Sequence, residues 1–328
     1  MDTIQKNVLM RYPLLLKPYL CEHIWGGDKL ITEYNKQTSN KTLSEAWEIS
    51  VNSSFPSVIN NGCYKDMTLM DLIKEFPEIL GKNTSNFPLL VKLINSKSLL
   101  SIQVHPDDAY ALANEGEQGK TEAWYILDAE EGAFIYLGFS EDVTLPVYKK
   151  TIANGTIETL LNKIEVKAGQ SFVVPAGTIH AIGGGITLLE IQENSSITYR
   201  VYDYKRLDVN GKERALHIDK ALAVTKLNKI EPTSFKQSHI YLHGKQVRVV
   251  ADSDYFTSYL VKGGFAFGFK EATTVTIVGG EGAVISKGER IDVVKGDSLF
   301  IPAGMSCRVM GSIKYVLTVE GEIYKCTI

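Results

Sequence analysis

Gln103 and His105 stand two positions apart in the apolar run Ser101-Ile-Gln-Val-His-Pro-Asp107. If this run is a β-strand, both side chains lie on one face, because successive side chains of a strand alternate between faces. Glu122 begins the next apolar run, and His180 follows a Pro-Ala-Gly bend further along the chain. Imidazole nitrogens, a carboxylate and an amide oxygen form a mixed ligand set that suits zinc with one open coordination position. An open position lets a metal polarise a substrate oxygen, which indicates a catalytic centre.

The two histidines stand out by their context. Most histidines of a folded protein are surface or hydrogen-bonded side chains rather than ligands. His105 is a candidate ligand because it shares one face of the expected strand with Gln103. His180 is a candidate because it follows a repeated segment, described below. Gln103 keeps two possible roles, a metal ligand or a hydrogen-bond partner of substrate or of a neighbouring ligand. The other histidines are interpreted as surface or hydrogen-bonded side chains: His23, His217, His239 and His243.

Two charged residues follow His180 at spacings that could place them near the same centre. Glu190 and Gln192 share one face of an expected strand, and Arg200 comes after that strand. A cation near the metal can stabilise a developing enediolate or hold an anionic ligand. The alternative is that Arg200 pairs with a nearby acid such as Asp203. Spacing alone leaves both alternatives open.

An internal repeat indicates how His180 is positioned. The segment GQSFVVPAG at 169–177 matches GDSLFIPAG at 296–304, an offset of 296 − 169 = 127 residues. Such self-similarity predicts a duplicated domain. In each copy a Gly turn starts a buried strand, and Pro-Ala-Gly ends it in a tight bend. Three positions after the last Gly stands His180 in the first copy and Cys307 in the second, so we expect the second copy to be structural.

The elements around these residues are predicted to be mostly short strands. Two stretches have helical periodicity, 68–80 and about 216–227. Dense short strands between Gly, Asn and Pro, without βαβ alternation, favour a barrel or a sandwich. The predicted strands are 98–104, 123–127, 132–137, 171–174, 187–192, 255–262 and 273–278.

The string G-x(5)-P-x-G-x(2)-H after an upstream strand with Gln103 and His105 is the pattern of the cupin barrel. By this resemblance the chain is mainly β, with two cupin, jelly-roll-like β-barrels and a small helical insertion near 68–80. The expected domains are a catalytic cupin domain at 1–235 and a cupin-like domain at 236–328 that lacks the metal histidine.

Composition limits the partners. The 328 residues carry a formal net charge of −3, which offers no broad attraction to nucleic acid or anionic membrane. No run approaches the roughly 18 apolar residues of a membrane span, and the N-terminus lacks the apolar core of a secretory signal. We expect a cytoplasmic monomer or homodimer whose thiols are reduced, because its four cysteines are scattered. These are Cys21, Cys63, Cys307 and Cys326.

Strings spread over most of the chain resemble the short, bacterial type I mannose-6-phosphate isomerases of the cupin superfamily. Any one string is weak evidence, but together they are specific. They are Lys17-Pro18, Ile24-Trp-Gly-Gly27, Glu45-Ala-Trp-Glu-Ile-Ser50, Pro88-Leu-Leu-Val-Lys92, Ser101-Ile-Gln-Val-His-Pro-Asp107, Gly119-Lys-Thr-Glu-Ala-Trp124, Pro175-Ala-Gly-Thr-Ile-His180 and Thr198-Tyr-Arg-Val-Tyr-Asp-Tyr204.

The resemblance implies one Zn²⁺ per chain and a sugar phosphate as substrate. The family's zinc ligands fall at His105, Glu122 and His180, with Gln103 joining in longer members, and its catalytic arginine falls at Arg200. The implied reaction interconverts mannose-6-phosphate and fructose-6-phosphate through a cis-enediol. The remaining implied site residues are Glu190 as a hypothetical base, and Lys120 or Lys92 against the phosphate or a sugar hydroxyl.

The chain departs from the longer relatives in ways that concern the base. Those relatives have an extra helical domain, a Lys-Pro-Glu string where this chain has Lys-Thr-Glu, and an Asp at the position of Ser196. The identity of the proton-transferring group therefore stays open. Two other functions are weighed, a metal-dependent cupin dioxygenase and a non-catalytic sugar-phosphate-binding cupin. Dioxygenases of this fold use more histidines than the two available, and the presence of Arg200 with a full ligand set disfavours a sensor.

Overall fold

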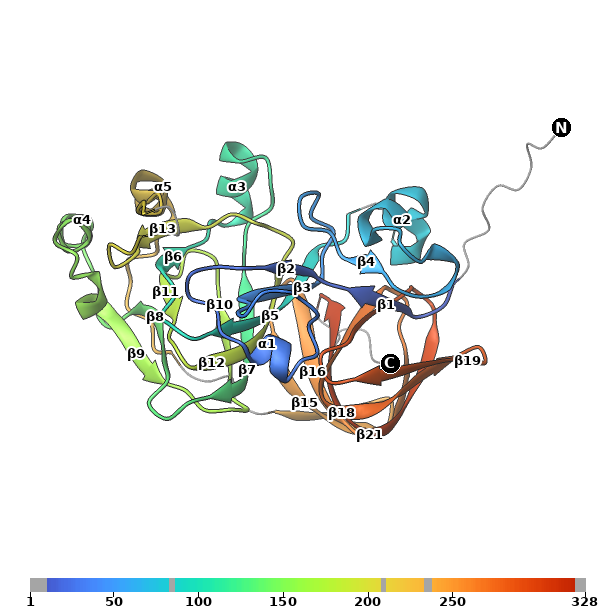
Figure 1. Ribbon diagram of the computed structural model, residues 1–328. Coiled ribbons are helices and arrows are strands. Elements are labelled where there is room, and N and C mark those ends of the chain that lie inside the picture. The colour runs from blue at the N-terminus through green and yellow to red at the C-terminus, as the bar shows by residue number, and fades with distance from the viewer. Residues whose placement is uncertain (1–10, 83–85, 208–210, 233–237, 322–328) are drawn as a thin grey trace. The chain divides into compact units, whose positions relative to one another are not determined.

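The computed structural model describes residues 11–82, 86–207, 211–232 and 238–321 (Figure 1). The architecture is mainly β, as predicted. Two compact units are present, unit 1 from Met1–Tyr19, Trp47–Leu89 and Gln237–Ile328, and unit 2 from Leu20–Ala46 and Leu90–Lys236. None of the helices in the described part of the chain has the length and apolarity to cross a membrane.

The division of the chain differs in detail from the one expected. The predicted boundary near 235 lies within 233–237, outside the described residues, and the division into domains at that point stays a prediction. The segment 47–89 groups with the C-terminal residues, because the strand Leu14–Lys17 pairs with Ser298–Ile301 on one side and Val58–Ile59 on the other. Strand pairing between distant parts of the chain thus builds unit 1.

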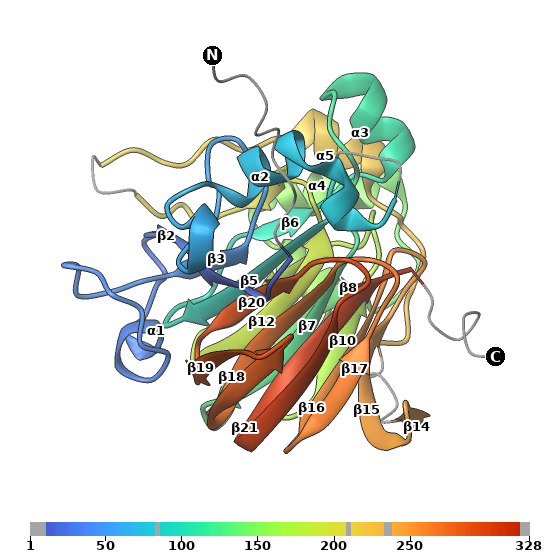
Figure 2. The same ribbon diagram turned by 90° about the vertical axis from the view of Figure 1, so that its right-hand side faces the viewer.

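Unit 1 is organised around one antiparallel sheet (Figure 2). Its strand order is β14-β15-β16-β21-β18-β20-β1-β4, with β17 paired to β21 and β19 paired to β18. The strands are β1 (Leu14–Lys17), β4 (Val58–Ile59), β14 (His239–Leu242), β15 (Lys245–Asp252), β16 (Phe256–Lys262), β17 (Phe265–Gly268), β18 (Thr273–Ser286), β19 (Glu289–Val294), β20 (Ser298–Ile301) and β21 (Ser306–Glu320).

The helix expected at 68–80 is present in two parts. Helix α2 (Leu69–Glu75) begins after Thr68, whose hydroxyl accepts a hydrogen bond from Asp71 N at 3.0 Å. Phe76 leaves the helical conformation because the residue before a proline disfavours it, and a 3-10 turn, η2 (Pro77–Leu80), follows. A short 3-10 turn, η1 (Gly62–Tyr64), precedes α2.

Unit 2 contains most of the remaining strands in two sheets. The six-stranded sheet has the order β10-β7-β12-β5-β3-β2, and the five-stranded sheet has the order β13-β6-β11-β8-β9. The first consists of β2 (Tyr19–Cys21), β3 (Glu45–Ile49), β5 (Leu89–Ser96), β7 (Glu122–Ala129), β10 (Ser171–Val174) and β12 (Ile186–Glu193). The second consists of β6 (Ile102–Val104), β8 (Phe134–Phe139), β9 (Leu161–Glu165), β11 (His180–Ile182) and β13 (Tyr199–Tyr202).

The two sheets of unit 2 pack face to face. One buried cluster joins Trp124 of β7 and Leu188 of β12 to Leu137 of β8 and Ile182 of β11. The opposite face of the five-stranded sheet packs under helices (Figure 1). The helices of this unit are α1 (Lys29–Thr32), α3 (Asp108–Asn114), α4 (Leu145–Asn154), η3 (Ile157–Leu160) and α5 (Ile218–Val224), of which α5 matches the expected helix near 216–227.

Side-chain parity in β6 follows from this packing. Ile102 and Val104 are fully buried in the cluster that also contains Tyr148 of α4 and Ala221 of α5. Because side chains alternate along a strand, Gln103 points to the other face, between the two sheets. The sheet therefore presents Gln103 toward β7.

The repeated segment has the same conformation in both copies. Its four glycines all have positive φ, 91° at Gly169, 84° at Gly177, 101° at Gly296 and 71° at Gly304. These values favour glycine over residues with a Cβ. The strand between each pair of glycines is largely buried. Each copy therefore has the predicted Gly turn followed by a buried strand.

Close backbone approach fixes the start of unit 2. A Cβ at Gly26 would lie 2.3 Å from Ser44 Oγ and 2.9 Å from Ser44 N. We expect Gly26→Ala to lower the free energy of unfolding by about 1–3 kcal/mol through overpacking, measured by urea denaturation. Gly279→Ala is the control, because a Cβ there would lie 3.6 Å from its nearest neighbour, Lys314 Cβ, which is an ordinary van der Waals distance. Equal stability of the two variants would contradict this account.

Candidate functional site

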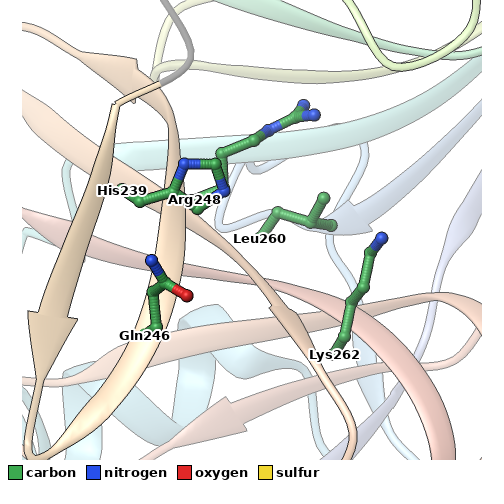
Figure 3. A pocket seen from close by; sticks show the side chains of 5 residues that line it. All are labelled: His239, Gln246, Arg248, Leu260 and Lys262. Carbon is green, nitrogen blue, oxygen red and sulfur yellow. The ribbon is translucent and has the colours of Figure 1, made fainter.

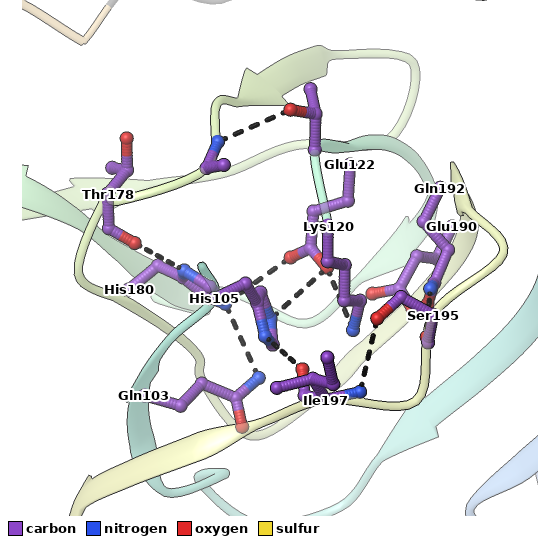
Figure 4. A network of polar contacts seen from close by, with 12 residues as sticks. Gln103, His105, Lys120, Glu122, Thr178, His180, Glu190, Gln192, Ser195 and Ile197 are labelled. Carbon is purple, nitrogen blue, oxygen red and sulfur yellow. Dashed lines mark hydrogen bonds and ion pairs between the residues drawn. The ribbon is translucent and has the colours of Figure 1, made fainter. Parts of the chain in front are cut away.

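Three buried side chains converge between the sheets of unit 2 (Figure 4). His105 follows β6, Glu122 is the first residue of β7, and His180 is the first residue of β11. His105 Nε2 lies 3.4 Å from one oxygen of Glu122, and His180 Nε2 lies 3.3 Å from the other. The three ligand atoms lie within 4.8 Å of one another, so one cation can contact all of them.

Backbone carbonyls fix the orientation of both imidazole rings. His105 Nδ1 is 2.8 Å from Ile197 O, and His180 Nδ1 is 2.8 Å from Thr178 O. Because a carbonyl only accepts, each Nδ1 carries the proton and each Nε2 presents its lone pair to the centre. Burial lowers the pKa of His180 to about 4 and lowers that of His105 well below its usual value. Both rings are therefore neutral ligands at neutral pH.

The centre leaves buried polar atoms without hydrogen bonds. Among the described residues, His105 Nε2 and Glu122 Oε1 have no hydrogen-bond partner. An unsatisfied buried polar atom is costly, and a carboxylate between two imidazoles is the donor set of a zinc site. Burial raises the pKa of Glu122 to about 7, and a bound dication offsets that cost of ionisation. These residues fit a divalent metal.

Gln103 lies beside the centre. Its amide nitrogen is 3.3 Å from His180 Nε2, and rotating the amide by half a turn exchanges this nitrogen for the oxygen. In the sheet, Gln103 stands opposite both His180 and Arg200, so these three side chains form one cross-strand row. Both roles predicted for Gln103, ligand or hydrogen-bond partner, are compatible with this position.

A second charged group lies on the six-stranded sheet. Lys92 Nζ is 3.2 Å from Glu190 Oε1 and 3.8 Å from Glu45 Oε2. Trp124 Nε1 donates a hydrogen bond to the other oxygen of Glu190 at 3.2 Å. Burial acts to raise the pKa of Glu190, but the cations of Lys92 and Lys120 outweigh it and lower that pKa. Glu190 is thus an ionised carboxylate with little access to bulk water.

Arg200 is held mainly by the backbone. Its Nη1 donates to Ala215 O at 2.8 Å, and its backbone N donates to His217 Nδ1 at 3.1 Å. Asp203 forms its ion pairs with Arg206 and Arg214. Among the described residues, the ion pair between Arg200 and Asp203 that the sequence left open is therefore absent. The guanidinium of Arg200 therefore donates to a backbone carbonyl, and its role toward an anionic ligand stays a prediction.

Sequence reasoning missed the side chains on the far side of Lys92. Glu45 lies between Lys92 and His23, whose Nε2 is 3.7 Å from Glu45 Oε1. The His23 ring stacks on Trp25 at 5.3 Å, which agrees with its interpretation as a partly exposed, bonded side chain. Glu45 begins one of the strings on which the family resemblance rests, Glu45-Ala-Trp-Glu-Ile-Ser50. Only the order of the strands in the sheet shows that its carboxylate reaches Lys92.

The loop that carries Lys120 is tightly held. Lys120 is buried, its Nζ lies 3.1 Å from Glu122 Oε2, and its backbone N donates to Pro106 O at 3.0 Å. A Cβ at Gly119 would lie 2.5 Å from the backbone of Asp107, so only glycine fits there. Thr121 N donates to Glu193 Oε2 at 2.6 Å. The loop therefore places Lys120 and Glu122 together.

Glu193 makes stability depend on pH. Burial raises its pKa to about 7, and the neighbouring Asp108 adds to the increase. A raised pKa means that the protonated form stabilises the fold, so this contribution is full below the unfolded value near 4.5 and is lost as pH rises through about 7. Glutamine does not titrate, so between pH 5 and pH 8 we expect Glu193→Gln to lose less free energy of unfolding than the parent, by on the order of 1–2 kcal/mol. Thermal unfolding of the parent and the variant at pH 5 and pH 8 measures this difference. The same pH dependence in both proteins would contradict the role of Glu193.

Comparisons with known proteins agree over most of the chain. Residues 14–135 match the family model "Phosphomannose isomerase type I, catalytic domain", and residues 245–319 match "Mannose-6-phosphate isomerase, cupin domain". The mannose-6-phosphate isomerase of Streptococcus mutans is 40% identical over 297 residues, covering 89% of this chain and 93% of that protein. Mannose-6-phosphate isomerase ManA of Bacillus subtilis is 36% identical, covering 89% and 94%.

Solved structures give the same result. The crystal structure of the mannose 6-phosphate isomerase from Bacillus subtilis has a TM-score of 0.87 and 35% identity, covering 94% of this chain and 99% of that one. A phosphomannose isomerase from Salmonella typhimurium has a TM-score of 0.74 at 17% identity, covering 94% of this chain and 100% of that one, which shows the fold alone.

Proposed function

Because this chain belongs to the type I phosphomannose isomerases, we propose that it interconverts mannose-6-phosphate and fructose-6-phosphate with one Zn²⁺ per chain. The observation that supports zinc is the pair of neutral imidazoles whose Nε2 atoms both face Glu122. His105, Glu122 and His180 would hold the ion, with Gln103 as a fourth ligand or a hydrogen-bond partner. When bound, zinc supplies ordering and polarisation of the substrate oxygens at C1 and C2.

We assign the proton transfer to Glu190. A carboxylate that the neighbouring lysine keeps ionised can take the proton from C2 of the aldose and return it to C1 of the cis-enediol. The reverse direction moves the proton from C1 to C2. Lys92 and Trp124 fix both oxygens of Glu190, which holds the base in one orientation.

Three cations serve the substrate in this proposal. Arg200 shares a cross-strand row with Gln103 and His180, so it offsets the negative charge that develops on the enediolate. Lys120 or Lys92 contacts the phosphate or a sugar hydroxyl. The substrate is a small sugar phosphate, and the cytoplasmic location and the monomeric or homodimeric state stay predictions.

Metal analysis coupled to activity tests the proposal. We expect purified protein to contain about one zinc per chain and to convert fructose-6-phosphate to mannose-6-phosphate in a coupled assay. Chelation is expected to remove both the metal and the activity, and added zinc is expected to restore both. Full activity of metal-free protein would overturn the metal-dependent mechanism.

The same preparation separates the alternatives. A cupin dioxygenase would consume oxygen and carry iron or manganese, whereas the described centre offers two histidines and one glutamate. A non-catalytic binding protein would bind fructose-6-phosphate without converting it. Neither alternative has an observation that favours it over the isomerase.

A further inference from the structure

A buried carboxylate joins two arginines next to the strand of Arg200. Asp203 directly follows β13, and only 4% of it is exposed. Arg214 donates to both of its oxygens, from Nε at 2.7 Å and from Nη2 at 2.6 Å, and Arg206 Nη2 donates to one of them. A guanidinium bound to a carboxylate through two parallel hydrogen bonds is held in one orientation. Asp203 therefore fixes the position of Arg214.

The residue after Arg214 contacts the side chain of Arg200. Ala215 O accepts a hydrogen bond from Arg200 Nη1 at 2.8 Å. Two residues further, His217 N donates to Arg200 O at 2.8 Å, and His217 Nδ1 accepts from Arg200 N at 3.1 Å. The segment 214–217 belongs to no helix or strand. Its position therefore depends on contacts such as these and on the ion pair with Asp203.

The charges around Arg200 also need this carboxylate. Burial and the charge of Arg214 lower the pKa of Arg200, and Asp203 opposes that effect. Like charges repel, so without Asp203 the repulsion between Arg200 and Arg214 would act to separate the two side chains. Among the described residues, Arg200 Nε is buried and has no hydrogen-bond partner. The bond from Nη1 to Ala215 O is therefore important for the orientation of the guanidinium.

We propose that Asp203 is a positioning residue of the isomerase, which acts through Arg214 and Ala215 on the guanidinium of Arg200. The inference rests on the proposed function, in which Arg200 offsets the charge that develops on the enediolate. A cation that is already oriented stabilises this charge without reorganisation. Such an interaction is made in the transition state, so its loss lowers kcat and leaves KM largely unchanged.

A double-mutant cycle in the full-length, zinc-loaded protein tests this role. Asp203→Asn keeps the shape of the side chain and removes its charge, and it is expected to lower kcat about tenfold while KM changes by less than about twofold. Arg200→Met is expected to lower kcat about a hundredfold or more. In the Arg200→Met background, Asp203→Asn is expected to change kcat by less than about twofold, because no guanidinium is left to orient. Zinc content and thermal unfolding are measured on each preparation.

A second variant keeps the test decisive if Asp203→Asn does not fold. Arg214→Lys keeps the charge but loses the two parallel hydrogen bonds, and it is expected to lower kcat about threefold or more, again only when Arg200 is present. Arg248→Lys is the matched control. Arg248 is also partly buried and lines a pocket of about 300 Å³ in unit 1 (Figure 3), as Arg214 lines one of about 290 Å³ in unit 2.

A second control matches the change at Asp203. Asp292→Asn alters the carboxylate of an exposed ion pair with Arg290 in unit 1, and both controls are expected to leave kcat unchanged. An equal fractional loss of kcat from Asp203→Asn in both backgrounds would overturn the positioning role, and so would parental kcat in Asp203→Asn and Arg214→Lys. Near-parental kcat in Arg200→Met is a different failure, because it would remove Arg200 from the proposed function and this inference with it.

Discussion

Glu122→Gln is expected to abolish zinc binding and to lower kcat/KM by about a thousandfold or more, the scale of the several kcal/mol that a metal ion contributes. Glu122 is the one anionic member of the cluster of His105, Glu122 and His180. Its amide replacement keeps the shape of the side chain but removes the charge that holds a dication. Metal content by elemental analysis and the coupled isomerase assay measure the two effects on one preparation.

The structure also predicts that Glu122→Gln loses zinc and activity without losing stability. Burial raises the pKa of Glu122 to about 7, so the ionised carboxylate is unfavourable in the metal-free protein. Metal-free Glu122→Gln is therefore expected to unfold no more easily than the metal-free parent at pH 8. Glu158→Gln, which changes a carboxylate at a Tyr136 contact away from the centre, is the matched control and is expected to stay active. A zinc-replete, active Glu122→Gln protein would remove Glu122 from the ligand set.

Local patterns were sufficient for the parts of the site that lie within single strands or bends. The two-residue spacing of Gln103 and His105 predicts a common direction, and the packing of Ile102 and Val104 on the other face of β6 accounts for it. The repeated Pro-Ala-Gly bend predicts the presentation of the residue three positions after it. That residue, His180, is the first of β11. In both cases a short-range geometric rule decides where a side chain points.

Contacts between strands could not be predicted in this way. Lys92, Glu190 and Glu45 come from β5, β12 and β3, which neighbour one another only because the sheet order is β12-β5-β3. Sequence spacing contains no information on that order, so the site of Lys92 was inferred only from resemblance. The same limit explains why the sequence did not assign the segment 47–89 to the unit of the C-terminal strands.

Besides the four-residue helix α1, two helices of unit 2, α3 and α4, were not predicted, although their start signals are present. Asp107 caps α3 by accepting a hydrogen bond from Tyr110 N at 3.0 Å, and a proline stands in the first turn of α4. Both helices are short, with one buried residue in α3 and two in α4. Such helices bury too little apolar surface to produce a strong 3.6-residue pattern. Capping residues were the better signal here.

Glu190→Gln is expected to lower kcat by about a hundredfold to ten-thousandfold, the range in which a positioned base contributes. The amide keeps the hydrogen bond from Trp124 Nε1 but cannot take a proton from the sugar. Glu190 is absent from the cluster of metal-ligating atoms, so the zinc content is expected to stay at the parental value. Turnover is measured in the coupled assay, and near-normal turnover would show that Glu190 is not the base.

A variant of Lys92 separates the role of Glu190 as a base from a role in packing. Lys92 lowers the pKa of Glu190, so Lys92→Met is expected to raise it and to move the acidic limb of the kcat/KM profile to higher pH, by about one unit or more. The sign follows because a base acts only when ionised, and a higher pKa requires a higher pH for ionisation. Lys163→Met, which removes a cation near Phe134, serves as the control and is expected to leave that limb in place. An acidic limb that stays fixed in Lys92→Met would assign the titration to a group other than Glu190.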